Sequence, residues 1–158
     1  MKKGDKSMKD QRRTDEDHKL AKFLGTKQIK VVTKGLSAEE GVKQIMALAT
    51  TPGLINLKPS DIFTLFKKSK ALSLLSASAK GKNAAGLLAK KIGATIKKGA
   101  GGCRKLIFNV TGNETMTLCD VNQIAESIYD LCHPKARIIF GAKLEKGMKG
   151  LEVAVVTG

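Results

Sequence analysis

The chain has 158 residues, 42% of them hydrophobic, which suits one globular domain with a real core. It carries 29 basic and 14 acidic residues, and the formal net charge of +15 favours nucleic acid, an anionic membrane surface or an acidic protein as partner. Three cysteines without a CxxC pair argue against a disulfide framework and a zinc site, so we expect no metal. Without a long apolar run or a secretion signal, the sequence predicts a cytoplasmic protein with no membrane span.

The N-terminal part of the chain is polar. Residues 1–22 hold few apolar side chains and interleave basic with acidic residues, so they bury too little surface to offset the entropy of ordering. We therefore predict a basic, largely disordered extension over residues 1–36, in which only residues 29–32 have the character of a strand. The folded domain is predicted over residues 37–158.

Two helices are predicted at the start of this domain. Ser37 and Glu40 have the spacing of a capping box, and the apolar positions after them predict a helix that ends at residues 50–53 (TTPG). A second helix is predicted over residues 60–68, with Ser60 as its N-cap.

Strands and helices then alternate. Residues 71–78 and 105–110 have the pattern of strands, and residues 83–98 between them have the apolar stripe of a helix. Thr117 and Asp120 resemble a capping box at the start of a further helix, which Pro134 ends.

The last two predicted strands span residues 137–143 and 151–156. The loop between them contains Gly147 and Gly150, and its length suits a hairpin. The order of elements predicts an α+β fold, a mixed four-stranded sheet packed with helices.

Four motifs carry a resemblance to a known family. Residues 52–62 (PGLINLKPSDI), 107–112 (IFNVTG), 116–118 (MTL) and 153–158 (VAVVTG) occur in this order. They resemble the C-terminal domain of FtsZ, the tubulin-like cell-division protein. The first motif is similar to the family loop G-x-x-N-x-D-x-x-D, which follows a long central helix. The resemblance covers residues 37–158 and implies the tubulin/FtsZ C-terminal-domain fold.

The resemblance also implies roles for the loop residues. In FtsZ and tubulin this loop enters the GTP site of the neighbouring subunit, where acidic residues position the water that attacks the γ-phosphate. Asp61 then has a catalytic role in trans and Asn56 a nucleotide contact, and Gly53 and Lys58 complete the nucleotide- and partner-contacting loop. Lys58 replaces the first family aspartate, so it either binds phosphate or abolishes hydrolysis. Asp61 equally fits a structural role as a helix-start carboxylate.

The sequence contains no G-G-G-T-G-[ST]-G phosphate loop, and residues 99–102 (GAGG) lack the strand-loop-helix context of one. We therefore expect that the chain is not an enzyme by itself and binds no cofactor alone. The resemblance implies that it contacts GTP only through a partner subunit. That partner is full-length FtsZ or a separate FtsZ-like GTPase domain.

A lysine-rich face offers a second kind of site. Residues 62–113 contain eleven basic and no acidic residues. Lysines seven residues apart stack along the predicted helix. The predicted anion-binding patch comprises Lys82, Lys90, Lys91, Lys97, Lys98, Arg104 and Lys105. A solvated basic surface is the simpler explanation, and the scarcity of aromatic side chains weakens single-strand nucleic-acid recognition.

Two functions from different classes follow. The first is a cell-division domain, cytoplasmic and at the division site, that docks through residues 56–61 on the nucleotide face of an FtsZ- or tubulin-like GTPase. Docking there modulates filament assembly or GTP hydrolysis in trans. The second is a nucleic-acid- or other anion-binding module that uses the lysine-rich face of the same scaffold. A third possibility is that the chain is one piece of a split protein whose GTPase half is encoded separately.

Overall fold

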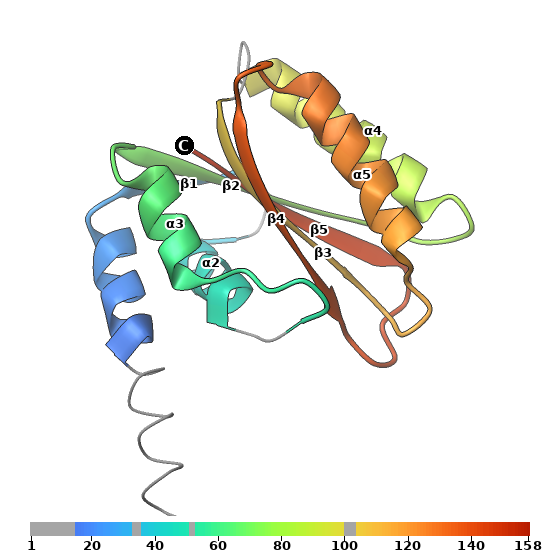
Figure 1. Cartoon of the computed structure of the whole chain (residues 1–158), viewed down its shortest axis with the longest axis horizontal. Coiled ribbons are helices and arrows are strands. Elements are labelled where there is room, and N and C mark those ends of the chain that lie inside the picture. The colour runs from blue at the N-terminus through green and yellow to red at the C-terminus, as the bar shows by residue number, and fades with distance from the viewer. Residues whose placement is uncertain (1–14, 33–35, 51–52, 100–103) are drawn as a thin grey trace, which may run out of the picture.

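The computed structural model describes residues 15–32, 36–50, 53–99 and 104–158. Five strands in this part of the chain form one mixed sheet in the order β1-β2-β5-β3-β4 (Figure 1). The strands are β1 (Gln28–Val31), β2 (Ala71–Ala79), β3 (Lys105–Gly112), β4 (Arg137–Leu144) and β5 (Leu151–Thr157). The predicted α+β fold with a mixed sheet is confirmed. The sheet has five strands instead of the predicted four because β1, from the N-terminal extension, pairs in parallel with β2.

The predicted hairpin between the last two strands is wrong. β4 pairs in parallel with β3 at the edge of the sheet, whereas β5 lies antiparallel between β2 and β3. The reason is visible in β5 itself, whose residues 153–156 are all buried. Such a continuous apolar run is typical of a central strand that is covered on both faces. The connecting loop turns at Gly147 and Gly150, whose φ angles are 80° and 81°.

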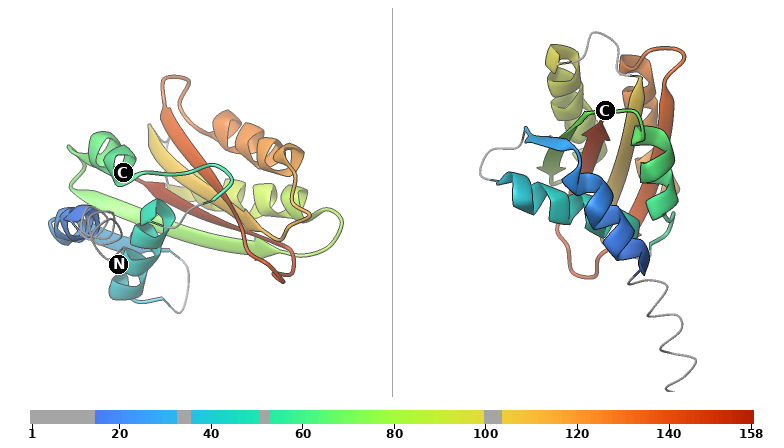
Figure 2. Two further views of the ribbon diagram at one scale, coloured as in Figure 1. Left: turned by 60° about the horizontal axis from the view of Figure 1, so that its bottom comes forward. Right: turned by 90° about the vertical axis from the view of Figure 1, so that its left-hand side faces the viewer.

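Helices cover both faces of the sheet (Figures 1 and 2). On one face, α4 (Ala84–Gly99) and α5 (Leu118–Leu131) pack over a core centred on Leu88, Phe108 and Ile124. On the other, α2 (Ala38–Thr50), α3 (Pro59–Phe66) and the helical residues 15–25 enclose a second core. The helix layers on both faces explain why the central strands β3 and β5 are nearly continuously buried.

The helix starts agree closely with the sequence. Ser37 Oγ accepts the N–H of Glu40 at 3.1 Å, and Thr117 and Asp120 form a reciprocal capping box at the start of α5. The predicted N-cap of α3 is wrong: Lys58 occupies this position instead of Ser60, because Pro59 takes the first helical turn. Proline suits that place, since its missing N–H would have no partner there.

The N-terminal extension is not largely disordered where the structure describes it. Residues 15–25 are helical, and the side chains of Leu20 and Leu24 are fully buried. The Phe23 ring packs edge-on against Phe63 with centroids 5.2 Å apart. Two buried leucines and the partly buried Phe23 thus form a narrow apolar stripe among the charges, which explains why the prediction was wrong for residues 15–32. Residues 1–14 lie outside the described part.

Candidate functional site

The loop between α2 and α3 is fixed against the edge strand β4. Ile55 and Ala142 exchange two backbone hydrogen bonds, each 3.0 Å long. Gly53 packs directly against this strand. A Cβ atom at this position would come within 2.5 Å of the Ala142 carbonyl oxygen, so the close approach requires glycine. Leu57 and Pro59 are buried and anchor the other end. The loop is therefore held in place at both of its ends.

Four side chains between or beside these anchors face solvent: Leu54, Asn56, Lys58 and Ser60. Two polar groups shape the loop internally. Asn56 Oδ1 accepts the N–H of Gly53 at 2.7 Å, and Asp61 Oδ2 accepts the N–H of Lys58 at 2.8 Å. The Asp61 carboxylate thus stabilises the start of α3, as one of its two predicted roles requires.

The structure places all four predicted loop residues in this one segment. Gly53 approaches the edge strand, Asn56 and Lys58 are exposed, and Asp61 is half-buried at the helix start. The side chains of Asn56 and Asp61 each accept a backbone N–H of the loop. These bonds give the loop a defined shape before any partner binds. This arrangement presents one cation and one amide to solvent beside a carboxylate.

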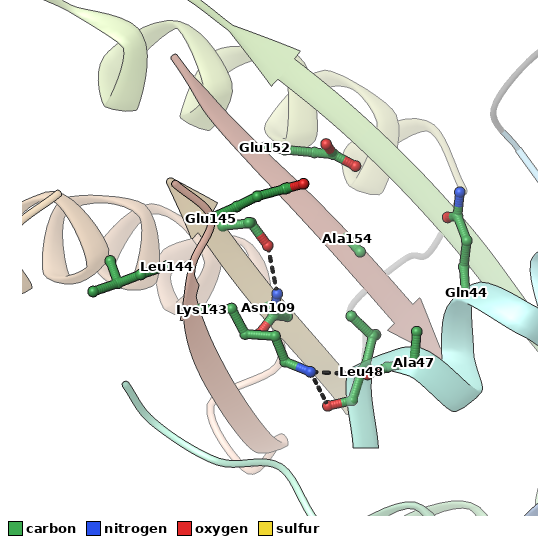
Figure 3. Close-up of a pocket in the computed structure, with 10 residues that line it drawn as sticks. Gln44, Ala47, Leu48, Asn109, Lys143, Leu144, Glu145, Glu152 and Ala154 are labelled. Carbon is green, nitrogen blue, oxygen red and sulfur yellow. Dashed lines mark hydrogen bonds between the residues drawn. The ribbon is translucent and has the colours of Figure 1, made fainter. Parts of the chain in front are cut away.

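A cleft of about 430 Å³ lies between α2 and the sheet (Figure 3). α2 contributes Gln44, Ala47 and Leu48, and the sheet contributes polar groups from β3, β4 and β5. The buried Asn109 donates from Nδ2 to Thr111 Oγ1 at 3.0 Å, while its Oδ1 atom has no hydrogen-bond partner. The sequence analysis did not identify this cleft.

Lys143 lines the same cleft and is only 8% exposed. Its ammonium donates to the carbonyl oxygens of Ala47 at 2.8 Å and Leu48 at 2.9 Å, in the last turns of α2 (Figure 3). A cation at this end of a helix complements the helix dipole. Burial nevertheless lowers the pKa of Lys143, because desolvation disfavours its charged form. The sequence signal for this residue was a lone lysine within the apolar strand RIIFGAKL.

The predicted anion-binding patch is not gathered at one place. Lys82 precedes α4, whereas Arg104 and Lys105 follow it, and the 16 residues of α4 separate them by about 24 Å along the helix. Lys90 is exposed, and Lys91 Nζ donates to the carbonyl oxygen of Ser78 at 2.7 Å. The side chains of Lys97 and Lys98 lie outside the described part. Of the described basic side chains of this patch, Lys90 and Lys91 are therefore on α4, whereas the others lie beyond its two ends.

Within the described residues, no three His, Cys, Asp or Glu side chains gather as metal ligands, and no helix is long and apolar enough to cross a membrane. Among the described residues, Cys119 is exposed and Cys132 is buried, and neither forms a disulfide. Cys103 lies outside the described part.

Comparison with known proteins shows which family the chain belongs to. A profile for the “FtsZ family, C-terminal domain” matches residues 73–158. The chain is 32% identical over 120 residues to cell division protein FtsZ of Caulobacter vibrioides, covering 73% of this chain and 24% of that protein. It is 33% identical over 123 residues to cell division protein FtsZ 1 of Archaeoglobus fulgidus, covering 74% of this chain and 33% of that protein. The chain thus spans about a quarter to a third of the length of these relatives.

Solved structures show the same fold. An FtsZ dimer of M. jannaschii matches with a TM-score of 0.63 at 16% identity, over 93% of this chain and 50% of that chain. TubZ of Bacillus thuringiensis serovar israelensis, in GDP-form protofilaments, matches with a TM-score of 0.57 at 12% identity, over 77% of this chain and 35% of that chain.

The sheet, its two helical layers and the loop before α3 define a C-terminal-type domain of the tubulin-like proteins. The chain belongs to the FtsZ family of cell-division proteins. The matched profile describes the C-terminal domain of that family, which is not its GTP-binding domain.

Proposed function

We propose that this chain docks through residues 53–61 on the nucleotide face of an FtsZ- or tubulin-like GTPase, and that docking modulates filament assembly or GTP hydrolysis in trans. The observation that carries the proposal is the anchored loop. Two backbone hydrogen bonds to β4 and two buried residues fix it, while Asn56 and Lys58 stay exposed. A surface loop that is shaped before binding loses little conformational entropy when a partner is bound.

The names of the structural relatives support a partner of the same family. One relative was solved as an FtsZ dimer and another as TubZ protofilaments. Head-to-tail assembly requires two different, complementary faces on each subunit. The sequence of this chain contains no glycine-rich phosphate loop of the family type, so the 158 residues supply the loop face alone. Bound at a filament end, they leave no nucleotide face for the next subunit.

The loop chemistry favours a regulator over a catalyst. Lys58 places a cation where the family pattern has a carboxylate, and a cation near a phosphate favours binding over the orientation of an attacking water. Asp61, the remaining carboxylate, already accepts the N–H of Lys58 at 2.8 Å. The proposed role therefore requires no GTP bound by this chain alone and no catalysis by it. Any GTP contact is made with nucleotide that the partner holds.

The test measures filament mass by sedimentation after substoichiometric addition of the 158-residue chain to GTP-assembled FtsZ. We expect less sedimented FtsZ. The variants Asn56→Ala and Asp61→Asn each weaken the effect about ten-fold, as expected for a contact worth about 1.4 kcal/mol. Thr64→Ala, an exposed change on α3 outside the loop, serves as the matched control. Unchanged sedimentation at every ratio of chain to FtsZ would reject the proposal.

The second candidate, anion binding by the lysine-rich face, predicts a different outcome. In that case DNA or RNA binds with an affinity that falls steeply with salt, and FtsZ filaments are unaffected. Lys82 and Lys105 lie beyond opposite ends of α4, so the described basic side chains give no single site that favours it.

A further inference from the structure

A dipeptide of β4, Ala142-Lys143, contacts the first part of the loop between α2 and α3, the docking loop of the proposed function, and the helix before it. Ala142 exchanges two backbone hydrogen bonds with Ile55. The Lys143 stem lies under Gly53, where a Cβ atom would be 2.7 Å from Lys143 Cγ. The Lys143 ammonium holds the end of α2, from which the loop emerges. One short segment thus contacts both the helix that enters the loop and the loop backbone.

The ammonium is an unexpected group at this place. An aliphatic side chain would fill the space without the free energy that burial of a charge requires. What the ammonium adds is a set of donors for carbonyl groups at the end of α2, which have no partner within the helix in its last turn. Its two hydrogen bonds, 2.8 Å and 2.9 Å long, tie this helix end to the sheet across 95 residues of sequence or more.

The bond lies where α2 faces a cleft. The cleft of about 430 Å³ separates α2 from the sheet on the side of Asn109 and Glu152, so packing there is incomplete. Leu48 and Ala49 pack into the second core, and on the cleft side a specific bond adds a fixed position to this non-directional packing. Lys143 provides that bond through its contacts with Ala47 and Leu48 (Figure 3).

From this geometry we infer that Lys143 is the positioning residue of the docking loop: it fixes the end of α2 on β4 and so presets the loop for its partner. The consequence for partner binding rests on the proposed function above. The consequence for the loop is a property of this chain alone and is measured without a partner.

The experiment compares Lys143→Met with the unchanged chain, with Lys143→Arg as the conservative variant. Lys146→Met, an exposed lysine in the next loop, removes the same charge and is the matched control. Amide hydrogen exchange is followed at Ile55 in the loop and at Val110 in the middle of β3. Binding of each variant to GTP-assembled FtsZ is measured by co-sedimentation.

We expect Ile55 to exchange about ten-fold faster in Lys143→Met, since hydrogen bonds from a charged donor are lost. Exchange at Val110 stays unchanged, and the melting temperature moves by no more than about 4 °C. Affinity for FtsZ falls about ten-fold in parallel. Lys143→Arg, which keeps the donors, recovers most of both effects, and Lys146→Met shows neither. A residue that merely supports the fold would change Ile55 and Val110 together.

The inference is overturned if Ile55 exchanges at the same rate in Lys143→Met and in the unchanged chain. Equal acceleration at Ile55 and Val110 overturns it as well, because the change is then global. If the unchanged chain does not bind FtsZ while Ile55 alone accelerates in Lys143→Met, the proposed function fails and the positioning role stands. If the unchanged chain binds and Lys143→Met binds equally well, the positioning role fails and the proposed function stands.

Discussion

At the scale of single residues, the site depends on groups whose role is set by distance and burial. Gly53 is required because a Cβ atom would lie 2.5 Å from a backbone oxygen of β4. The side chain of Lys143 is only 8% exposed, and its ammonium donates hydrogen bonds to two carbonyl oxygens. Burial lowers the pKa of Lys143, because desolvation disfavours the charged form.

This pKa shift makes stability depend on pH in a definite direction. In the unfolded chain Lys143 titrates near its ordinary value of 10.5, whereas in the folded chain it releases its proton at lower pH. Between the two values the unfolded state binds more protons, so the free energy of unfolding rises with pH. We expect urea denaturation between neutral pH and about pH 10.5 to show a gain for the unchanged chain relative to Lys143→Met.

The comparison with Lys143→Met removes the contribution of the other lysines, which titrate in both proteins. The neutral amine still donates hydrogen bonds, so the bonds to α2 survive deprotonation. A stability difference that shrinks with rising pH would mean that the α2 carbonyls stabilise the ammonium more than burial destabilises it.

At the scale of elements, local signals predicted more than long-range ones. Ser37 and Thr117 were identified as caps because capping depends on neighbours three residues away. The loop residues 53–61 were found together because they are contiguous. The order of strands was not predictable in the same way, since β5 inserts between β2 and β3 from the far end of the chain. The contact of Lys143 with α2 was not predictable either, because it joins residues 95 positions apart in the sequence.

The helix over residues 15–25 gives the clearest prediction at this scale. Leu24 is fully buried in the core that α2 and α3 share. Leu24→Ala should lower the free energy of unfolding by about 3 kcal/mol, the usual loss for a large-to-small change in a core. Urea denaturation measures it, with the exposed Lys22→Ala as control. A change as small as that of the control would show that this helix contributes nothing to the folded domain.

At the scale of the whole molecule, two features are separate in space. The loop lies on β4 beside α2 and α3, whereas α4, with its basic side chains, lies on the opposite face of the sheet (Figure 1). The charge of +15 acts at a distance on any acidic partner, while the loop acts only in contact. Charge of this kind mainly changes the rate of encounter, and close contacts mainly change the rate of dissociation.

The two features should therefore separate in the kinetics of binding to GTP-assembled FtsZ. Raising the salt concentration from about 0.1 M to about 1 M shortens the Debye length from about 10 Å to about 3 Å, so the association rate should fall. The dissociation rate should change little. Lys90→Gln, on the exposed face of α4, should slow association alone, whereas Asn56→Ala should speed dissociation. Stopped-flow fluorescence with labelled chain measures both rates. If Lys90→Gln accelerates dissociation and Asn56→Ala has no effect, the face of α4 is the contact surface and the loop is not.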